Sequence, residues 1–217
     1  MPLRYLVFDL DETLYPRRSG IMEEIGVRMT QYIVERFGLS REEAEALRRR
    51  YRAQYGTTLA GLRTDRHIDP QDFLAYVHNL PIEDYLIPNG ELDAALGCIP
   101  LTKVVFTNAS REHAQRVLDV LGIARHFSRI FDITDMEYAC KPNPQAYSRL
   151  LALLQAQPEE CILVEDSTRN LAPAKALGMR TVLVDGEGDA NVDFVIQHVA
   201  QIGDVVHRLL MLPGGGD

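Results

Sequence analysis

The sequence YLVFDLDET, at residues 5–13, decides the fold of this chain. An apolar run of strand length ends abruptly in two aspartates, Asp9 and Asp11. In an extended chain, residues i and i+2 point to the same side, and two ionised carboxylates held that close repel each other. A cation or a mobile proton would compensate the repulsion, whereas an Asp-x-Asp in a solvated turn would need neither. The pair therefore indicates a candidate site for chemistry at the end of a buried strand.

The bulk composition bounds the class of protein. A chain of 217 residues suits one domain, or one domain with a smaller domain inserted into it. No apolar run approaches the roughly 18 residues that cross a bilayer, and the N-terminus does not have the form of a signal peptide. The three cysteines, Cys98, Cys140 and Cys161, form no disulfide framework. We therefore expect a cytoplasmic protein with no membrane partner.

The charge is distributed unevenly along the chain. The net charge of -8 argues against a nucleic-acid polymer as partner. Residues 16–88 hold 11 basic and 11 acidic residues, so the other residues, with 12 basic and 20 acidic, carry the whole -8. An acidic metal-binding body under a separate, neutral lid would have this distribution, although an accident of composition would also produce it.

Short apolar runs recur as expected strands. They lie at residues 5–8, 103–106, 130–133, 161–165 and 181–184, with 194–196 as a candidate sixth. Their lack of strict alternation suits strands that are buried on both faces. Segments with helical spacing lie between them, at residues 111–121, 144–154 and 172–177. This order predicts an α/β fold with a Rossmann-like parallel sheet.

Residues 16–88 break that alternation and contain no convincing strand. Residues 22–37 and 70–77 have helical patterns, and Ser40 and Glu43 form a capping box that opens another helix through residue 51 or beyond. The sequence therefore predicts a core made of residues 1–15 and 89–217, with an α-helical domain inserted at residues 16–88. Tyr15-Pro16 and Ile87-Pro88 are the expected hinges.

Three further polar clusters follow the expected strands. They are Thr107-Asn108, Lys141-Pro142 and the run from Glu165 to Ser167. In an open parallel sheet, ligands bind beyond the carboxyl ends of the strands, so we expect these clusters to meet the two aspartates at one edge. Oxygen ligands with few carboxylates favour Mg²⁺. A lysine and a threonine at the same edge can bind phosphate oxygens.

With these motifs the chain resembles the haloacid dehalogenase superfamily. Its four motifs are matched in order by residues 9–13, 107–108, 141–142 and 165–167. The resemblance implies a Rossmann-like core, an inserted α-helical cap of the C1 type, Mg²⁺ as cofactor and a small phosphomonoester as substrate. The superfamily's dehalogenases have no acid at the position of Asp11, so the resemblance favours phosphatases and phosphomutases.

The resemblance also implies a role for each matched residue. Asp9 would be the nucleophile that forms an aspartyl phosphate, and Asp11 the general acid and base, with a raised pKa. Thr107 and Lys141 would hold the phosphoryl group, and Asn108 would either shape its loop or contact phosphate through its N–H. The expected Mg²⁺ ligands are Asp9, the backbone carbonyl of Asp11, Asp166 and, directly or from a second layer, Glu165.

The segment 16–88 resembles one branch of the superfamily, the pyrimidine 5'-nucleotidase-like phosphatases. The similar stretches are residues 14–20, 55–62 and 72–81. We therefore expect a pyrimidine nucleoside 5'-monophosphate as substrate, with Thr57 and Thr58 placed to contact it. A sugar-phosphate phosphatase or phosphomutase is the alternative of the same chemistry, and a non-catalytic binding protein of the same fold is the alternative from another class. The oligomeric state stays open.

Overall fold

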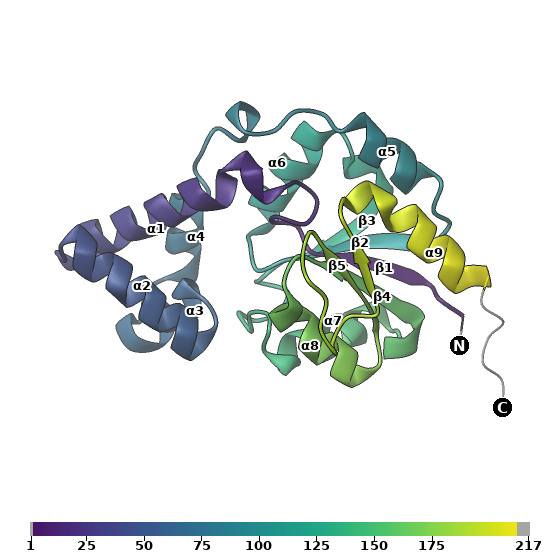
Figure 1. The fold of residues 1–217 in the computed structure, drawn as a ribbon. Helices are drawn as coiled ribbons and strands as arrows, with labels where there is room; N and C mark the ends of the chain where they lie inside the picture. The colour runs from purple at the N-terminus through teal and green to yellow at the C-terminus, as the bar shows by residue number, and fades with distance from the viewer. Residues whose placement is uncertain (1, 212–217) are drawn as a thin grey trace.

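A computed structural model of the chain describes residues 2–211 and contains a parallel β-sheet (Figure 1). The described residues form six strands in the order β3-β2-β1-β4-β5-β6, and all neighbours are parallel. The predicted α/β fold is therefore confirmed. The strands are β1 (Tyr5–Phe8), β2 (Thr102–Phe106), β3 (Phe127–Phe131), β4 (Cys161–Glu165), β5 (Arg180–Val184) and β6 (Phe194–Ile196).

Helices cover both faces of the sheet. The side chain of Val7 faces a core that includes residues of α7 (Pro144–Leu154) and α8 (Thr168–Leu177). Its neighbours Leu6 and Phe8 face the opposite core, which includes residues of α5 (Gly90–Gly97), α6 (Arg111–Leu121) and α9 (Ile202–Met211). This division explains why the strand has no polar face: β1 lies in the middle of the sheet with helices on both sides.

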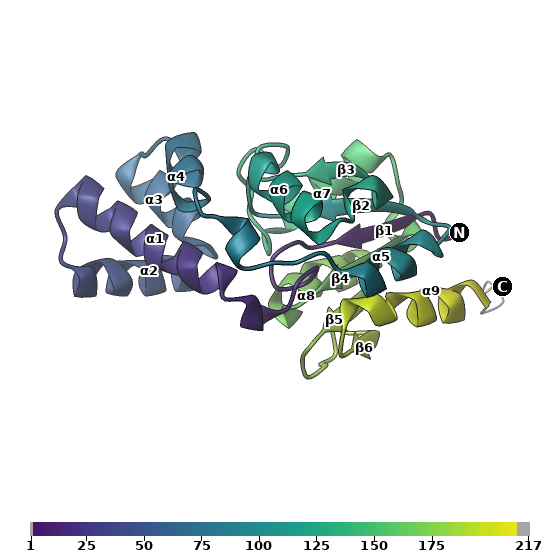
Figure 2. The same cartoon turned by 90° about the horizontal axis from the view of Figure 1, so that it is seen from above.

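A group of four helices follows β1 and lies to one side of the sheet in Figures 1 and 2. These helices, named here the helical group, are α1 (Ile21–Phe37), α2 (Arg41–Tyr55), α3 (Thr58–Arg66) and α4 (Pro70–Val77). Ser40 and Glu43 form the predicted capping box at the start of α2. The proposed domain boundaries at residues 15/16 and 88/89 stay a prediction, and residues 212–217 of the predicted core lie outside the described residues.

Three local differences separate the structure from the sequence-based prediction. The helices α3, α5 and α9 were not expected, and β3 covers residues 127–131 rather than 130–133. As the edge strand, β3 begins with half-buried and exposed residues, so its start has no apolar signal. Helix α8 begins at Thr168 rather than residue 172, because Pro173 is tolerated inside it.

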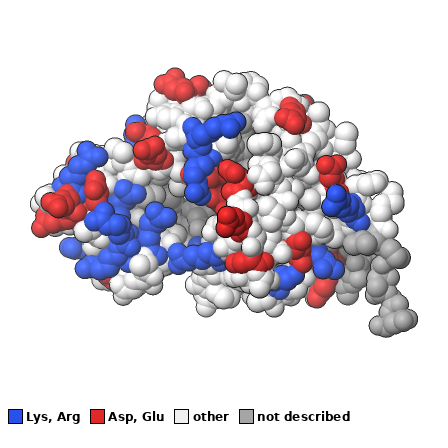
Figure 3. All heavy atoms as spheres, viewed as in Figure 1, with Lys and Arg blue, Asp and Glu red and all other residues white. Residues whose placement is uncertain are grey.

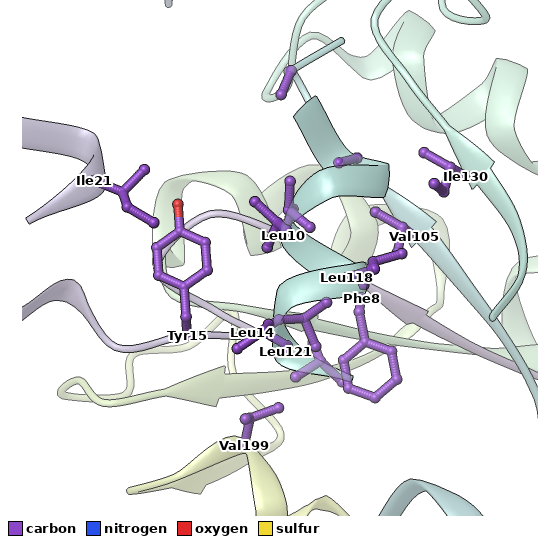
Figure 4. Packing of buried hydrophobic residues seen from close by; sticks show 14 of the residues in the cluster. Phe8, Leu10, Leu14, Tyr15, Ile21, Val105, Leu118, Leu121, Ile130 and Val199 are labelled. Carbon is purple, nitrogen blue, oxygen red and sulfur yellow. The ribbon is translucent and has the colours of Figure 1, made fainter. Parts of the chain in front are cut away.

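The buried core continues from the sheet into the start of the helical group. Figure 4 shows Phe8 and Val105 of the sheet near Leu118 of α6, with Tyr15 beyond Leu10 in the direction of Ile21. Tyr15 is only 2% exposed, so the segment that leaves β1 is fixed by packing. No helix within residues 2–211 combines the length and the apolar character needed to cross a membrane.

Candidate active site

The predicted polar clusters meet at the carboxyl edge of the sheet. The register pairs Phe8 of β1 with Val105 of β2 and Val164 of β4. Because the strands run in parallel, the residues that follow each of them emerge side by side. The backbone N–H of Asp9 continues the ladder by donating to the carbonyl of Val164 (2.9 Å). The edge therefore places Asp9 beside the end of β4, where Glu165 and Asp166 lie.

Lys141 is the centre of a buried ionic network. Its Nζ atom donates to Asp9 Oδ1 (2.5 Å), to Glu165 Oε1 (3.0 Å) and to the carbonyl of Phe106 (2.8 Å). Burial alone would lower the pKa of Lys141, but the carboxylates of Asp9 and Glu165 raise it well above its usual value. The lysine is therefore a permanently charged ammonium, held between two acids on the sheet edge.

The acids at this edge suit a hard divalent cation. Carboxylate oxygens of Asp9, Glu165 and Asp166 lie within 4.8 Å of one another. Burial raises the pKa of Asp9 and of Asp166, and the repulsion of nearby acids adds to the shift. A single lysine leaves this acidic cluster with excess negative charge in a poorly solvated place, which is costly without a cation. The all-oxygen donor set fits Mg²⁺.

Glu165 accepts three hydrogen bonds, more than the other acids of the cluster. It accepts from Lys141 through Oε1, from the side chain of Asn170 (2.7 Å) and from the backbone N–H of Ser167 (3.0 Å). Asp9 and Asp166 have fewer donors, because Asp9 Oδ2 accepts only from Thr13 (3.1 Å). This geometry favours Glu165 as a residue that orients Lys141 and the loop after β4.

Asp11 sits in a different environment from Asp9. Its Oδ1 atom accepts a hydrogen bond from the hydroxyl of Tyr15 (2.6 Å) and lies 3.2 Å from Nε2 of His113. Burial would raise the pKa of Asp11, but these two partners stabilise the ionised form and lower the pKa below its usual value. The expectation of a raised pKa is therefore wrong for this arrangement of the site.

Thr107 and Asn108 follow β2 and shape the loops around Lys141. The Asn108 side chain accepts from the N–H of Lys141 (2.8 Å) and donates to its carbonyl (3.1 Å). The Thr107 hydroxyl is buried and accepts from the N–H of Ala109 (3.0 Å). Of the two readings left open for Asn108, the side-chain contacts match the loop-shaping one.

Two neighbours of the site were not singled out from the sequence. Arg17 reaches from the loop after β1 to Asp166 Oδ2 (3.0 Å) and to Glu12 Oε2 (3.0 Å). Its side chain is 71% exposed, so these ion pairs contribute little stability. His113 is fully buried on α6 beside Asp11. The sequence did offer one signal for His113: it lies on the buried face of α6, the helix that follows the second motif.

A cavity of about 620 Å³ lies between this edge and the helical group. Asp9, Asp11, Lys141 and Asp166 line one side, while Thr57 and Thr58 line the other. Thr57 caps α3 by accepting from the N–H of Ala60 (3.0 Å), and its hydroxyl contacts Cys140 Sγ (3.3 Å). The hydroxyl of Thr58 is buried without a hydrogen-bond partner. All the predicted site residues except Thr107 and Glu165 therefore line one cavity, and those two lie directly behind it.

Comparison with known proteins identifies the class. The profile of the haloacid dehalogenase-like hydrolases matches residues 3–178, which is most of the chain. The chain belongs to this family and is a hydrolase of the superfamily that contains phosphatases.

Particular relatives extend the comparison. The chain is 29% identical over 195 residues to Phosphate metabolism protein 8 of Saccharomyces cerevisiae, covering 81% of this chain and 60% of the yeast protein. It is 26% identical over 210 residues to Beta-phosphoglucomutase of Bacillus subtilis, covering 92% of both chains. A solved HAD phosphatase from Thermococcus onnurineus has the same fold, with a TM-score of 0.63 at 20% identity over 94% of this chain and 98% of that one.

Proposed function

We propose that this protein is a Mg²⁺-dependent phosphatase that hydrolyses small phosphomonoesters through an aspartyl phosphate on Asp9. One observation carries the proposal: Lys141 is buried between Asp9 and Glu165, at the sheet edge where Asp166 completes an acidic cluster. Such a cluster combines a nucleophile, a fixed positive charge for phosphoryl oxygens and a cation site within one cavity.

In the first step, a carboxylate oxygen of Asp9 attacks the phosphorus atom and the bond to the leaving oxygen breaks. Lys141 orients Asp9 and offsets the negative charge of the phosphoryl oxygens. Bound at Asp9, Asp166 and the carbonyl of Asp11, Mg²⁺ would neutralise the remaining charge repulsion. Thr107 and Asn108 hold the loops that present Lys141 and the backbone N–H groups to the phosphoryl group.

Asp11 transfers the protons. Its carboxyl gives a proton to the leaving alkoxide, and its carboxylate then takes one from the water that attacks the aspartyl phosphate. The hydrogen bonds from Tyr15 and His113 favour the ionised form, which is the form the second step requires. A bound phosphate dianion close by would raise the pKa of Asp11 again, because like charges repel.

The proposed substrate is a pyrimidine nucleoside 5'-monophosphate in the cytoplasm, bound under the helical group acting as a cap. The branch-like stretches around Thr57 and Thr58 support this, because both residues line the same cavity as Asp9. Closure of such a cap would exclude bulk water during transfer. Neither a nucleic-acid polymer nor a membrane is part of the proposal.

A phosphomutase is the second candidate function. It is favoured by the similarity to Beta-phosphoglucomutase of Bacillus subtilis, which covers 92% of both chains. A mutase would pass the phosphoryl group of Asp9 to a second hydroxyl of the substrate rather than to water. Release of inorganic phosphate from a hexose phosphate, compared with formation of its isomer, separates the two reactions.

The test is hydrolysis of p-nitrophenyl phosphate with Mg²⁺ and with EDTA, followed by a substrate panel. We expect turnover only with Mg²⁺, and faster hydrolysis of UMP and CMP than of AMP and glucose 6-phosphate. Absence of turnover in Mg²⁺ would leave the non-catalytic binding protein as the explanation. A preference for purine or sugar phosphates would reject the nucleotide assignment and keep the phosphatase chemistry.

A further inference from the structure

The helical group contributes a basic wall to the active-site cavity. Arg48 and Arg52 of α2 line the 620 Å³ cavity that also contains Asp9 and Lys141. Both arginines also line an adjoining cavity of about 310 Å³, whose wall adds Arg41 and Arg49. Figure 3 shows Lys and Arg side chains gathered over the helical group beside a hollow, with Asp and Glu side chains on the sheet side. Basic side chains therefore predominate on the wall that α2 contributes, although Glu23 of α1 lines both cavities.

The guanidinium of Arg48 is held in place by α1. Its Nη1 atom donates to the hydroxyl of Thr30 (2.6 Å), which in turn donates to the carbonyl of Gly26 (3.2 Å). A Cβ atom at Gly26 would lie only 3.0 Å from Arg48 Nη2. Glycine inside a helix lowers stability relative to alanine, so its presence here makes room for the arginine.

Within residues 2–211, neither Arg48 nor Arg52 forms an ion pair with a carboxylate. The Nε atom of Arg48 is buried and has no hydrogen-bond partner. Burial lowers the pKa of Arg48, and the positive charge of Arg52 adds to the shift. The nearby acid Glu45 is paired with Arg41 (3.1 Å). Two positive charges therefore line the cavity without a paired carboxylate among the described residues.

We propose that Arg48 and Arg52 bind a second anionic group of the substrate, a carboxylate or a second phosphate, at the end of the cavity opposite Asp9. The inference rests on the proposed function only for the reacting phosphoryl group. A planar guanidinium presents paired donors that match either anion. A phosphomonoester with a neutral far end, such as the nucleoside monophosphate proposed above, would leave the two guanidinium groups without an anion. A preference for substrates that are anionic at both ends would therefore replace the nucleotide assignment and keep the phosphatase chemistry.

Three substrate pairs test the proposal by differing only in the second anion. They are 3-phosphoglycerate against glycerol 3-phosphate, fructose 1,6-bisphosphate against fructose 6-phosphate, and uridine 3',5'-bisphosphate against UMP. We expect kcat/KM to be at least about ten-fold higher for the doubly anionic member of one pair or more. The first pair reports a carboxylate and the other two report a phosphate.

Substitutions in α2 assign the preference to the arginines. Arg48→Gln and Arg52→Gln should each reduce the kcat/KM ratio within the preferred pair by about ten-fold. Gly26→Ala should reduce it by less, because the new methyl group shifts the guanidinium of Arg48 by only a few tenths of an ångström. Arg50→Gln is the matched control, since Arg50 is exposed on the same helix and lines neither cavity. Arg52 is exposed, so its variant stays informative if Arg48→Gln fails to fold.

The two proposals can fail separately. No preference in any pair, or a preference that persists in both arginine variants, overturns the second-anion site while the phosphatase stands. Calorimetric titration of Asp9→Asn with the same pairs measures the preference without turnover. If wild-type protein hydrolyses no phosphomonoester but Asp9→Asn binds the doubly anionic members more tightly, the phosphatase proposal fails and the anion site stands.

Discussion

The two walls of the cavity differ in how completely their polar groups are bonded. On the sheet edge, Asp9 and Glu165 each accept two or more hydrogen bonds from neighbouring residues. On the helical group, three side-chain atoms are buried without a partner, among them Arg48 Nε and Thr58 Oγ1, whereas within residues 2–211 the sheet side has one such atom, His113 Nδ1. A buried polar group without a hydrogen bond is costly. The acids of the sheet edge are therefore held in place by the protein's own hydrogen bonds. If the proposed function holds, we expect substrate to pair with the helical wall only after a side-chain rearrangement, because Arg48 Nε and Thr58 Oγ1 are buried.

We expect the largest effect on activity from a substitution of Asp9, the proposed nucleophile on the sheet-edge wall. Asp9→Asn replaces the attacking carboxylate with an amide, so kcat for p-nitrophenyl phosphate should fall by on the order of 10⁴-fold or more. Asp185→Asn is the matched control, because Asp185 follows β5 at the same edge but is exposed and lines no part of the cavity. Comparable activity of Asp9→Asn and the wild type would remove the aspartyl phosphate from the mechanism.

The next effect is on stability and concerns the positive charge of Lys141, which lies between the buried acids of the sheet edge. Lys141→Met leaves Asp9 and Glu165 buried without their counter-charge, so the free energy of unfolding in urea should fall by about 3–5 kcal/mol. Lys175→Met removes a partly exposed lysine that pairs with Asp193, and should cost less than about 1 kcal/mol. Equal losses in the two variants would mean that Lys141 does not balance the buried acids. Both are measured at neutral pH without Mg²⁺.

The same contrast explains what could be predicted from the sequence. Asp9 and Asp166 directly follow β1 and β4, and Lys141 lies on the loop after β3; parallel register brings these segments to one edge once the strands are known. Thus Asp9, Lys141 and Asp166 could be foreseen as neighbours from their motifs. Helices α6 and α7 were predicted to the residue, because Ser110, Gly122 and Pro144 mark their ends.

The helical wall could not be foreseen in the same way. In the sequence, Arg48 and Arg52 belong to a run of four arginines, and such runs are usually solvated. Spacing along α2 does not say which of them meets α1. The contact of Arg48 with Gly26 joins positions 22 residues apart in sequence, and only the packing of two helices reveals it. Likewise, the pKa of Asp11 depends on Tyr15 and on His113, which lies about a hundred positions away. Tertiary contacts of this kind leave no periodic signal.

A smaller effect is expected on the pH dependence of stability, which reports on the buried His78 near Asp11. His78 stacks on His113 (4.2 Å between ring centres) and contacts Ser110. Burial lowers the pKa of His78 to about 3, and the nearby charges of His113 and Arg116 add to the shift against an opposing contribution from Asp11. Because the folded pKa lies below the unfolded value of 6.5, the unfolded chain binds more protons between these values. Stability is then lost as the pH falls below about 6.5.

For one such histidine, the free energy of unfolding should fall by about 2 kcal/mol between pH 7 and pH 5. His78→Gln should lack this part of the pH dependence in chemical denaturation. His207→Gln, at an exposed position of α9, should keep it. Parallel pH curves for wild type and His78→Gln would show that His78 is not held neutral in the fold.

We expect the smallest effects on stability from substitutions of two adjacent threonines of the helical wall, Thr57 and Thr58. Thr58→Val removes a buried hydroxyl that has no partner, so stability should be unchanged or rise by up to about 1 kcal/mol. Thr57→Val removes the helix cap of α3 and should cost about 1 kcal/mol.

If the Thr58 hydroxyl binds substrate, Thr58→Val should nonetheless raise KM several-fold, because the substrate loses a hydrogen bond of about 1 kcal/mol. Steady-state kinetics and thermal unfolding of both variants separate the two roles. A stabilised Thr58→Val with unchanged KM would mean that the unpaired hydroxyl is a packing defect and that substrate does not complete this wall at Thr58. If substrate pairs with the Thr58 hydroxyl, Thr58→Val should be more stable than the wild type and should bind substrate more weakly.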